Sequence, residues 1–182
     1  MNRLVSVLAL LLTAVAVTSV GAQDHSECEQ VRADADESIA RSKDNFRDKS
    51  NFEARARVQI LKMYEVCKDE SLEGQYGPTL VDIEERMGEH EFTLAKYYYN
   101  QYRAGKGGLK GAESRLRIIL EKYVEYSKSD EVLFLLGRTY VFEHRQEDGT
   151  ATFTDLIRKY PASPLAYKAQ TYIDRLAAKP SQ

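Results

Sequence analysis

Histidine and cysteine, which most metal sites and many catalytic centres require, are scarce in this sequence. The chain has three histidines, two cysteines and no tryptophan among its 182 residues. His90 stands next to Glu91, but the second histidine that a zinc-binding helix needs is missing. No serine occupies the setting of a nucleophile elbow. We therefore predict a protein that is not an enzyme and that uses neither a metal nor a small-molecule cofactor.

An excess of basic charge is also absent. The sequence holds 26 Lys and Arg residues against 28 Asp and Glu residues, which gives a formal net charge of −2 at pH 7. Domains that bind nucleic acid usually gather basic residues on one face and have a high isoelectric point. We therefore expect no nucleic-acid partner.

The glycine-rich stretch at residues 104–111 does not fit a phosphate-binding loop. Its Gly105-Lys106 pair is followed by Gly107 instead of the Ser or Thr that such a loop requires, and the flanking segments are helical in pattern. We interpret this stretch as a flexible turn between two helices.

No segment sustains the alternation of polar and apolar residues that a strand requires. Apolar residues recur at helical spacing instead, so we expect an all-α fold. Thr79, followed three residues later by Asp82, resembles a capping box. We therefore expect residues 71–77 to be a polar link and a long helix to begin near Thr79 and to reach about Tyr102.

The N-terminal apolar run covers residues 4–17 and follows a single basic residue, Arg3. It is shorter than the ~20 residues that a membrane-spanning helix needs. Small residues precede a cleavage point after Ala22, as a leader peptidase requires. We predict that residues 1–22 are a cleaved secretory signal, with a membrane anchor as the alternative, and that the rest is one domain's length of exported chain.

Cys28 and Cys67 lie on the apolar stripes of two consecutive helical segments. If the chain reverses near Lys49, an antiparallel hairpin within residues 23–76 brings the two cysteines within one helical turn of each other. The CxxC spacing of redox and metal sites is absent, and disulfides persist in exported proteins. We predict a structural disulfide; two buried free thiols or a reactive pair are the alternatives.

The C-terminal half contains a self-match at a fixed spacing. Five positions recur about 37 residues later, and a group ahead of them recurs about 42 residues later. The first set is Ala112, Leu116, Ile119, Tyr123 and Val124, matched by Gly149, Phe153, Leu156, Tyr160 and Pro161; the second is Leu94, Ala95 and Tyr98, matched by Leu136, Gly137 and Tyr140. Such a period is typical of a helical repeat array, in which stacked units supply the core.

The second copy resembles the tetratricopeptide repeat in its Leu136-Gly137 pair, its Tyr140, its late aromatic Phe153 and its closing Pro161. A final helix is expected after Ser163 and Pro164, with the serine as its cap. The resemblance implies a right-handed solenoid of helical hairpins, with about seven helices in the chain. Residues 77–182 would hold the repeats and a C-terminal capping helix.

Three stretches are similar to the BamD (YfiO) group of bacterial outer-membrane assembly proteins. They are residues 91–98 with their Leu-Ala-x-Tyr-Tyr pattern, residues 112–116 with Ala-x-x-Arg-Leu, and residues 160–163 with Tyr-Pro-x-Ser. The resemblance covers residues 79–176 and implies a periplasmic scaffold for protein–protein interaction in outer-membrane protein assembly, with peripheral outer-membrane association. The lipid-bearing cysteine usual after the leader in that group is absent, since Gln23 follows Ala22.

The alternative is an adaptor in cell-wall synthesis or envelope constriction, similar to the CpoB group. Proteins of that group usually add an N-terminal trimerising coiled coil. Residues 28–46 carry a single apolar stripe that is too short to supply several heptads. The BamD-like role is therefore our first hypothesis.

In such repeats the first helix of each pair lines a concave groove for the partner. The resemblance places on this groove Phe92, Lys96, Tyr99 and Asn100 from the first copy, and Phe134, Arg138, Val141 and Phe142 from the second. Aromatic rings beside fixed cations suit an extended peptide segment that carries a carboxylate or a terminal aromatic residue. The alternative is that the aromatic residues pack into the core, Phe134 and Phe142 among them.

Overall fold

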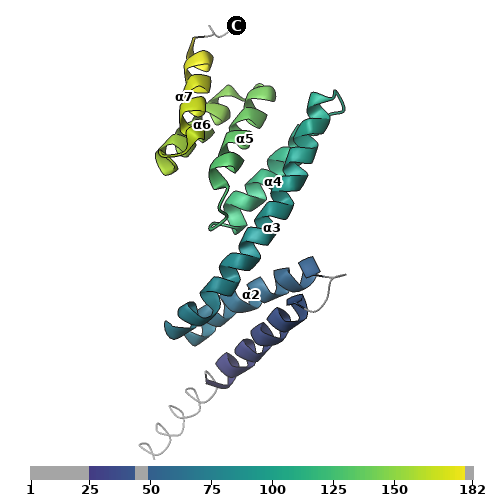
Figure 1. Ribbon diagram of the computed structural model, residues 1–182, viewed down its shortest axis with the longest axis vertical. Coiled ribbons are helices and arrows are strands. Elements are labelled where there is room, and N and C mark those ends of the chain that lie inside the picture. Colours follow the sequence, from purple (N-terminus) through teal and green to yellow (C-terminus); the bar gives the residue numbers. More distant parts are fainter. Residues whose placement is uncertain (1–24, 44–48, 179–182) are drawn as a thin grey trace, which may run out of the picture. The chain divides into compact units, whose positions relative to one another are not determined.

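The computed structural model describes residues 25–43 and 49–178, and these residues form seven helices and no strand (Figure 1). After a first helix at residues 25–43, the helices are α2 (Lys49–Cys67), α3 (Ser71–Arg103), α4 (Leu109–Lys122), α5 (Ser129–Phe142), α6 (Gln146–Lys159) and α7 (Pro164–Ala177). The predicted all-α class is confirmed. The predicted signal sequence, residues 1–22, lies outside the described residues.

The chain divides into two compact units, Met1–Ile83 and Glu84–Gln182, and α3 begins in the first and ends in the second. In the first unit a disulfide joins the first helix to α2. The Cys28 and Cys67 sulfur atoms are 2.06 Å apart and the two Cα atoms are 5.0 Å apart. Both helices bury an apolar stripe, to which Val31 contributes from the first helix and Ile60 from α2. The predicted pairing of the cysteines is thus present in the structure.

Helix α3 begins at Ser71, about two turns before the start that the sequence pattern predicts. Residues 71–77 are helical, and Pro78 lies inside the helix. Leu72 and Tyr76 are buried at 3% and 4% exposure. Burial of two such side chains contributes ~3–6 kcal/mol, which offsets the ~3 kcal/mol that a proline costs inside a helix. The predicted polar link is wrong because packing outweighs local propensity.

Hydrogen bonds fix this first part of α3 against the first helix. The Tyr76 hydroxyl donates to Asp36 Oδ1 at 2.8 Å, and Arg32 Nε donates to the Tyr76 oxygen at 3.3 Å. At the start of α3, the Ser71 amide donates to Asp69 Oδ1 at 2.9 Å. The Tyr76 side chain therefore anchors the segment by both its ring and its hydroxyl.

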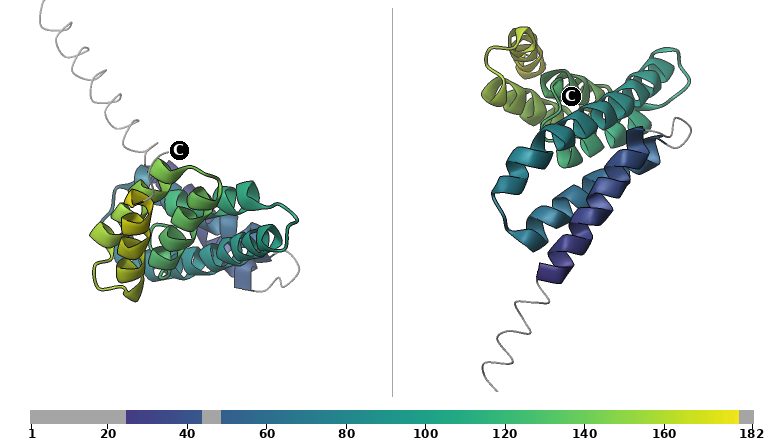
Figure 2. Two further views of the ribbon diagram at one scale, coloured as in Figure 1. Left: turned by 90° about the horizontal axis from the view of Figure 1, so that it is seen from above. Right: turned by 60° about the horizontal axis from the view of Figure 1, so that its bottom comes forward.

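In the second unit each helix packs on the next. Helix α4 contacts α5, α5 contacts α6, α6 contacts α7, and α5 also contacts α7. Figures 1 and 2 agree in placing α5, α6 and α7 side by side. Short turns between consecutive helices make the neighbours antiparallel, so the unit consists of the pairs α3/α4 and α5/α6 followed by α7.

A glycine faces an aromatic ring inside each helix pair. A Cβ atom on Gly137 of α5 would lie 2.6 Å from Phe153 Cε1 on α6, and one on Gly111 of α4 would lie 2.9 Å from Tyr98 Cγ on α3. Phe153 is fully buried. The close approach of the paired helices therefore depends on glycine at these two positions. Of the two, Gly137 is the one that belongs to the tetratricopeptide pattern noted in the sequence.

The turn and the cap that the sequence predicts are both present. The backbone between α3 and α4 takes positive φ at Gly105, Gly107 and Gly108, with values of 75°, 76° and 120°, which suits residues without a side chain. At the start of α7 the Ser163 hydroxyl oxygen accepts from the Leu165 amide, and Pro164 takes the first helical position. None of the described helices is both long and apolar enough to cross a bilayer.

Candidate partner-binding groove

An open cavity of about 390 Å³ lies in the second unit, and we call it the groove. Its walls come from α3, α5 and the start of α7, so every second helix contributes to it. The lining residues are Phe92, Lys96, Asp130, Glu131, Phe134, Leu135, Pro164 and Leu165. The groove therefore combines apolar walls with charged side chains.

Helix α3 contributes one buried ring and one cation to the groove. Phe92 is only 2% exposed, and its ring meets that of Tyr126 edge-on at 6.2 Å between centroids. Phe92 therefore lines the groove as predicted, but most of its side chain is packed in the core, as in the alternative interpretation. Lys96 follows one turn later, and its Nζ lies 4.3 Å from the centroid of the Phe92 ring.

Glu89 helps to hold Lys96 in place. The Glu89 carboxylate accepts from the Tyr126 hydroxyl at 2.6 Å and from Lys128 Nζ at 2.7 Å, and Lys96 Nζ lies 3.8 Å from it. The hydrogen bonds from Lys128 and Tyr126 hold the pKa of Glu89 below its usual value. Burial, followed by the hydrogen bond to Glu89, raises the pKa of the Tyr126 phenol. Glu89 is thus a carboxylate shared by several donors.

Helix α5 contributes the second predicted pair, Phe134 and Arg138. The half-buried Phe134 ring contacts the rings of Phe153 and Tyr172, each at 5.8 Å between centroids. The Arg138 guanidinium carbon lies 5.2 Å from the centroid of the Tyr99 ring and 5.9 Å from that of Phe134. The structure therefore joins α3 and α5 by a cation and two aromatic rings.

Arg138 has cation–π contacts but no anionic partner among the described residues. Its Nε atom is buried and has no hydrogen-bond acceptor, and the buried Tyr99 hydroxyl beside it also lacks a hydrogen bond. Burial raises the pKa of Tyr99, and the positive charge of Arg138 acts against that rise. Unpaired buried polar groups are rare and costly in folded proteins. Arg138 is not among the residues that line the groove, but it is only half-buried and lies next to Phe134, which does line it. The guanidinium is therefore the cation nearest to the groove that lacks an anionic partner among the described residues.

The other predicted groove residues have different surroundings. Tyr99 is 4% exposed and packs with Leu109 and Ala112, so it is a core residue and not an exposed one. Phe142 is 39% exposed, and its ring contacts those of Tyr99 and Tyr102. Asn100 is exposed. None of the three lines the cavity.

Val141 lies at the interface between α5 and α6, and not on the groove. Its Cγ2 atom would be 2.9 Å from a Cβ atom on Gly149. The prediction that Val141 lies on the groove is therefore wrong, because its side chain packs toward α6, the second helix of its own pair.

Sequence reasoning missed the acidic end of the groove and the contribution of α7. Asp130 accepts from the Ser163 hydroxyl at 2.5 Å and from the Glu131 amide at 2.8 Å. Glu131 is exposed and has no ion pair with any described residue. Helix α7 occupies the position of the first helix in a third repeat. Extending the repeat pattern to that copy would therefore have placed Pro164 and Leu165 on the groove, beside the residues of α3 and α5.

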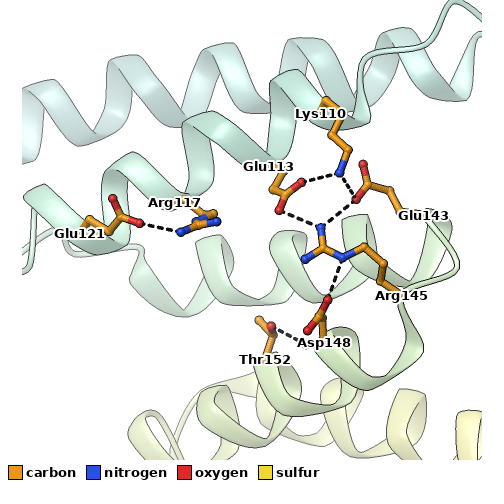
Figure 3. A network of polar contacts seen from close by, with 8 residues as sticks. All are labelled: Lys110, Glu113, Arg117, Glu121, Glu143, Arg145, Asp148 and Thr152. Atoms are coloured by element: carbon orange, nitrogen blue, oxygen red, sulfur yellow. Dashed lines mark hydrogen bonds and ion pairs between the residues drawn. The ribbon is translucent and has the colours of Figure 1, made fainter.

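A second charged cluster, shown in Figure 3, ties α4 to the turn between α5 and α6. Arg145 Nη1 lies 2.8 Å from Glu113 Oε1 and 3.3 Å from Glu143 Oε2, and its Nε lies 2.7 Å from Asp148 Oδ2. Lys110 Nζ bridges the carboxylates of Glu113 and Glu143 at 3.1 and 3.2 Å. Its cations and carboxylates are thus paired with one another, and the cluster serves to position helices.

Within the ranges that the structure describes, no group of three or more His, Cys, Asp or Glu side chains could hold a metal ion. Comparison of the chain with protein-family models, with curated proteins and with solved structures found no match. The groove is therefore interpreted from its own geometry and chemistry.

Proposed function

We propose that this chain is a non-enzymatic scaffold of the bacterial cell envelope that binds an extended segment of another envelope protein in the groove. The observation that carries the proposal is Arg138, which has no anionic partner among the described residues and lies next to Phe134 of the cavity wall. An extended peptide can place apolar side chains in such a cavity and a carboxylate on a guanidinium.

The proposed cellular role is outer-membrane protein assembly, in the manner of the BamD group and as a right-handed stack of tetratricopeptide hairpins. Helix pairs closed by glycine against an aromatic ring support the repeat assignment. The disulfide is compatible with an oxidising compartment, which supports export to the periplasm. Peripheral association with the outer membrane would follow from contact with an assembly complex.

Cross-linking in intact envelopes followed by mass spectrometry tests the role. Recovery of a β-barrel insertase supports outer-membrane assembly, whereas recovery of cell-wall synthases supports the alternative role in cell-wall synthesis or envelope constriction. If proteins of neither class are recovered, both proposed roles are contradicted.

Charge reversal within the groove tests the site. The double variant Lys96→Glu/Arg138→Glu is expected to lose capture of the partner while keeping its helical circular dichroism. The matched control is Lys62→Glu/Lys106→Glu, which makes the same change of charge at two exposed lysines away from the groove lining. Capture that is equal for the two double variants would reject the groove as the binding site.

A further inference from the structure

We infer that the groove selects a mixed-charge segment, in which a large apolar side chain stands between one acidic and one basic residue. This inference rests on the proposed function, since it assumes that the groove binds an extended peptide. It adds the chemistry of the peptide, which follows from an uneven distribution of charge along the groove.

A positive charge lies just beyond one end of the groove: Arg138 follows Phe134 by one turn of α5, and its guanidinium carbon is 5.9 Å from the centroid of that ring. Arg138 has no ion pair with a described residue. Its guanidinium carbon lies 5.2 Å from the centroid of the Tyr99 ring, and its charge acts against the rise in the pKa of Tyr99 that burial causes. A carboxylate of the ligand that reached past Phe134 would give the guanidinium an anionic partner.

The other end, at the start of α5, has an excess of negative charge. Glu131 and Asp130 line the cavity there, and Glu131 has no ion pair with a described residue. Lys96 also lines this part of the groove, but Glu89 lies 3.8 Å from its ammonium group. The exposed carboxylate of Glu131 is therefore available to a basic side chain of the ligand.

The apolar walls lie between the two charged ends. Phe134 and Leu135 follow Glu131 and precede Arg138 on α5. At a rise of 1.5 Å per residue, the two ends are ~10–12 Å apart along the helix. An extended peptide advances ~3.3 Å per residue and directs alternate side chains to one side. A base, a large apolar residue and an acid at every second position therefore match the groove.

Three blocked peptides test the inference by NMR titration of the full-length oxidised protein. Their cores are Lys-Ser-Phe-Ser-Glu, Glu-Ser-Phe-Ser-Glu and Lys-Ser-Phe-Ser-Lys, each with acetylated and amidated ends, so that the charges are those of side chains alone. The mixed-charge peptide is expected to bind about tenfold more tightly than either of the other two, because each of those places a like charge at one end.

Charge exchange in the protein should change this preference. Arg138→Glu is expected to favour the dilysine peptide and Glu131→Lys the diglutamate peptide, and the double exchange is expected to restore preference for the mixed peptide, bound in the reverse direction. Arg138→Met keeps an apolar side chain of similar length and should bind the dilysine and mixed-charge peptides equally well. It serves as the test if Arg138→Glu does not fold.

Equal affinity for the three peptides would overturn the charge selection. If that binding were still lost in Phe134→Ala, the groove would remain a peptide site and the proposed function would stand. No binding of any peptide would also overturn the inference, whereas the proposed function would then be decided by the envelope cross-linking experiment alone.

Discussion

The contact between Gly137 and Phe153 predicts that Gly137→Ala destabilises the second unit. The new Cβ atom would lie 2.6, 2.8 and 2.9 Å from three atoms of the Phe153 ring. That ring is fully buried and is stacked on Tyr172 at 5.1 Å between centroids, so it has little room to move. Overpacking of this kind costs up to ~3 kcal/mol, and the better helix propensity of alanine returns ~1 kcal/mol. We expect a net loss of ~2 kcal/mol.

Urea unfolding followed by far-ultraviolet circular dichroism measures this loss. The comparison variant is Gly74→Ala in α3, where the new Cβ atom would lie more than 4 Å from every described atom outside its own stretch of helix, and where we expect a gain of ~0.5–1 kcal/mol from propensity alone. The same substitution should thus have opposite signs at the two sites.

A double-mutant cycle identifies the cause of the loss. Phe153→Leu removes the ring atoms that the new methyl group meets, so Gly137→Ala should cost at least ~1 kcal/mol less in the Phe153→Leu background than in the wild type. If Gly137→Ala left the protein as stable as the wild type, or if the two changes were simply additive, the close-approach argument would be refuted.

Three further results are expected. Reduction of the disulfide, which spans 39 residues, should destabilise the first unit by ~3–4 kcal/mol, seen as faster hydrogen exchange at residues 25–43 and in α2; unchanged exchange there would contradict it. Arg145→Met should lower the unfolding free energy at pH 7 and flatten the acid side of the stability profile, because it removes the ion pair with Glu113. Burial raises the pKa of Glu113, but the hydrogen bonds from Arg145 and Lys110 outweigh it and lower that pKa overall. The stability that Glu113 contributes is therefore present above about pH 5 and lost as the pH falls below ~4. Urea titrations across this range measure it, and parallel profiles of unfolding free energy against pH for the wild type and Arg145→Met would contradict this role of the ion pair. Tyr126→Phe should lower the unfolding free energy by ~1–3 kcal/mol, because it removes the 2.6 Å hydrogen bond to Glu89 and keeps the ring; a variant as stable as the wild type would show that this bond adds nothing.

Local patterns predicted several elements correctly. The Ser163-Pro164 start of α7 and the glycine turn before α4 depend on the backbone preferences of single residues, which the sequence displays directly. The pairing of Cys28 with Cys67 followed from helical periodicity and one chain reversal. Each of these features needs only short-range information.

The start of α3 and the exposure of the groove aromatics could not be predicted in the same way. Pro78 and its neighbouring glycines indicated a break, but the burial of Tyr76 against residues far away in the chain extends the helix through them. Phe92 and Tyr99 lie on α3, where helical spacing alone does not distinguish covered positions from exposed ones. The packing of α4 and α5 decides which of their rings are buried.

The sequence by itself determined the all-α class and the succession of helices in the second unit, because periodicity and turn chemistry are local properties of the chain. Tertiary structure alone decided that Asp130 and Glu131 line one end of the groove and that Arg138 has no anionic partner among the residues that the structure describes. Charge pairing depends on which side chains of different helices come within a few ångströms, and a linear pattern does not carry that information.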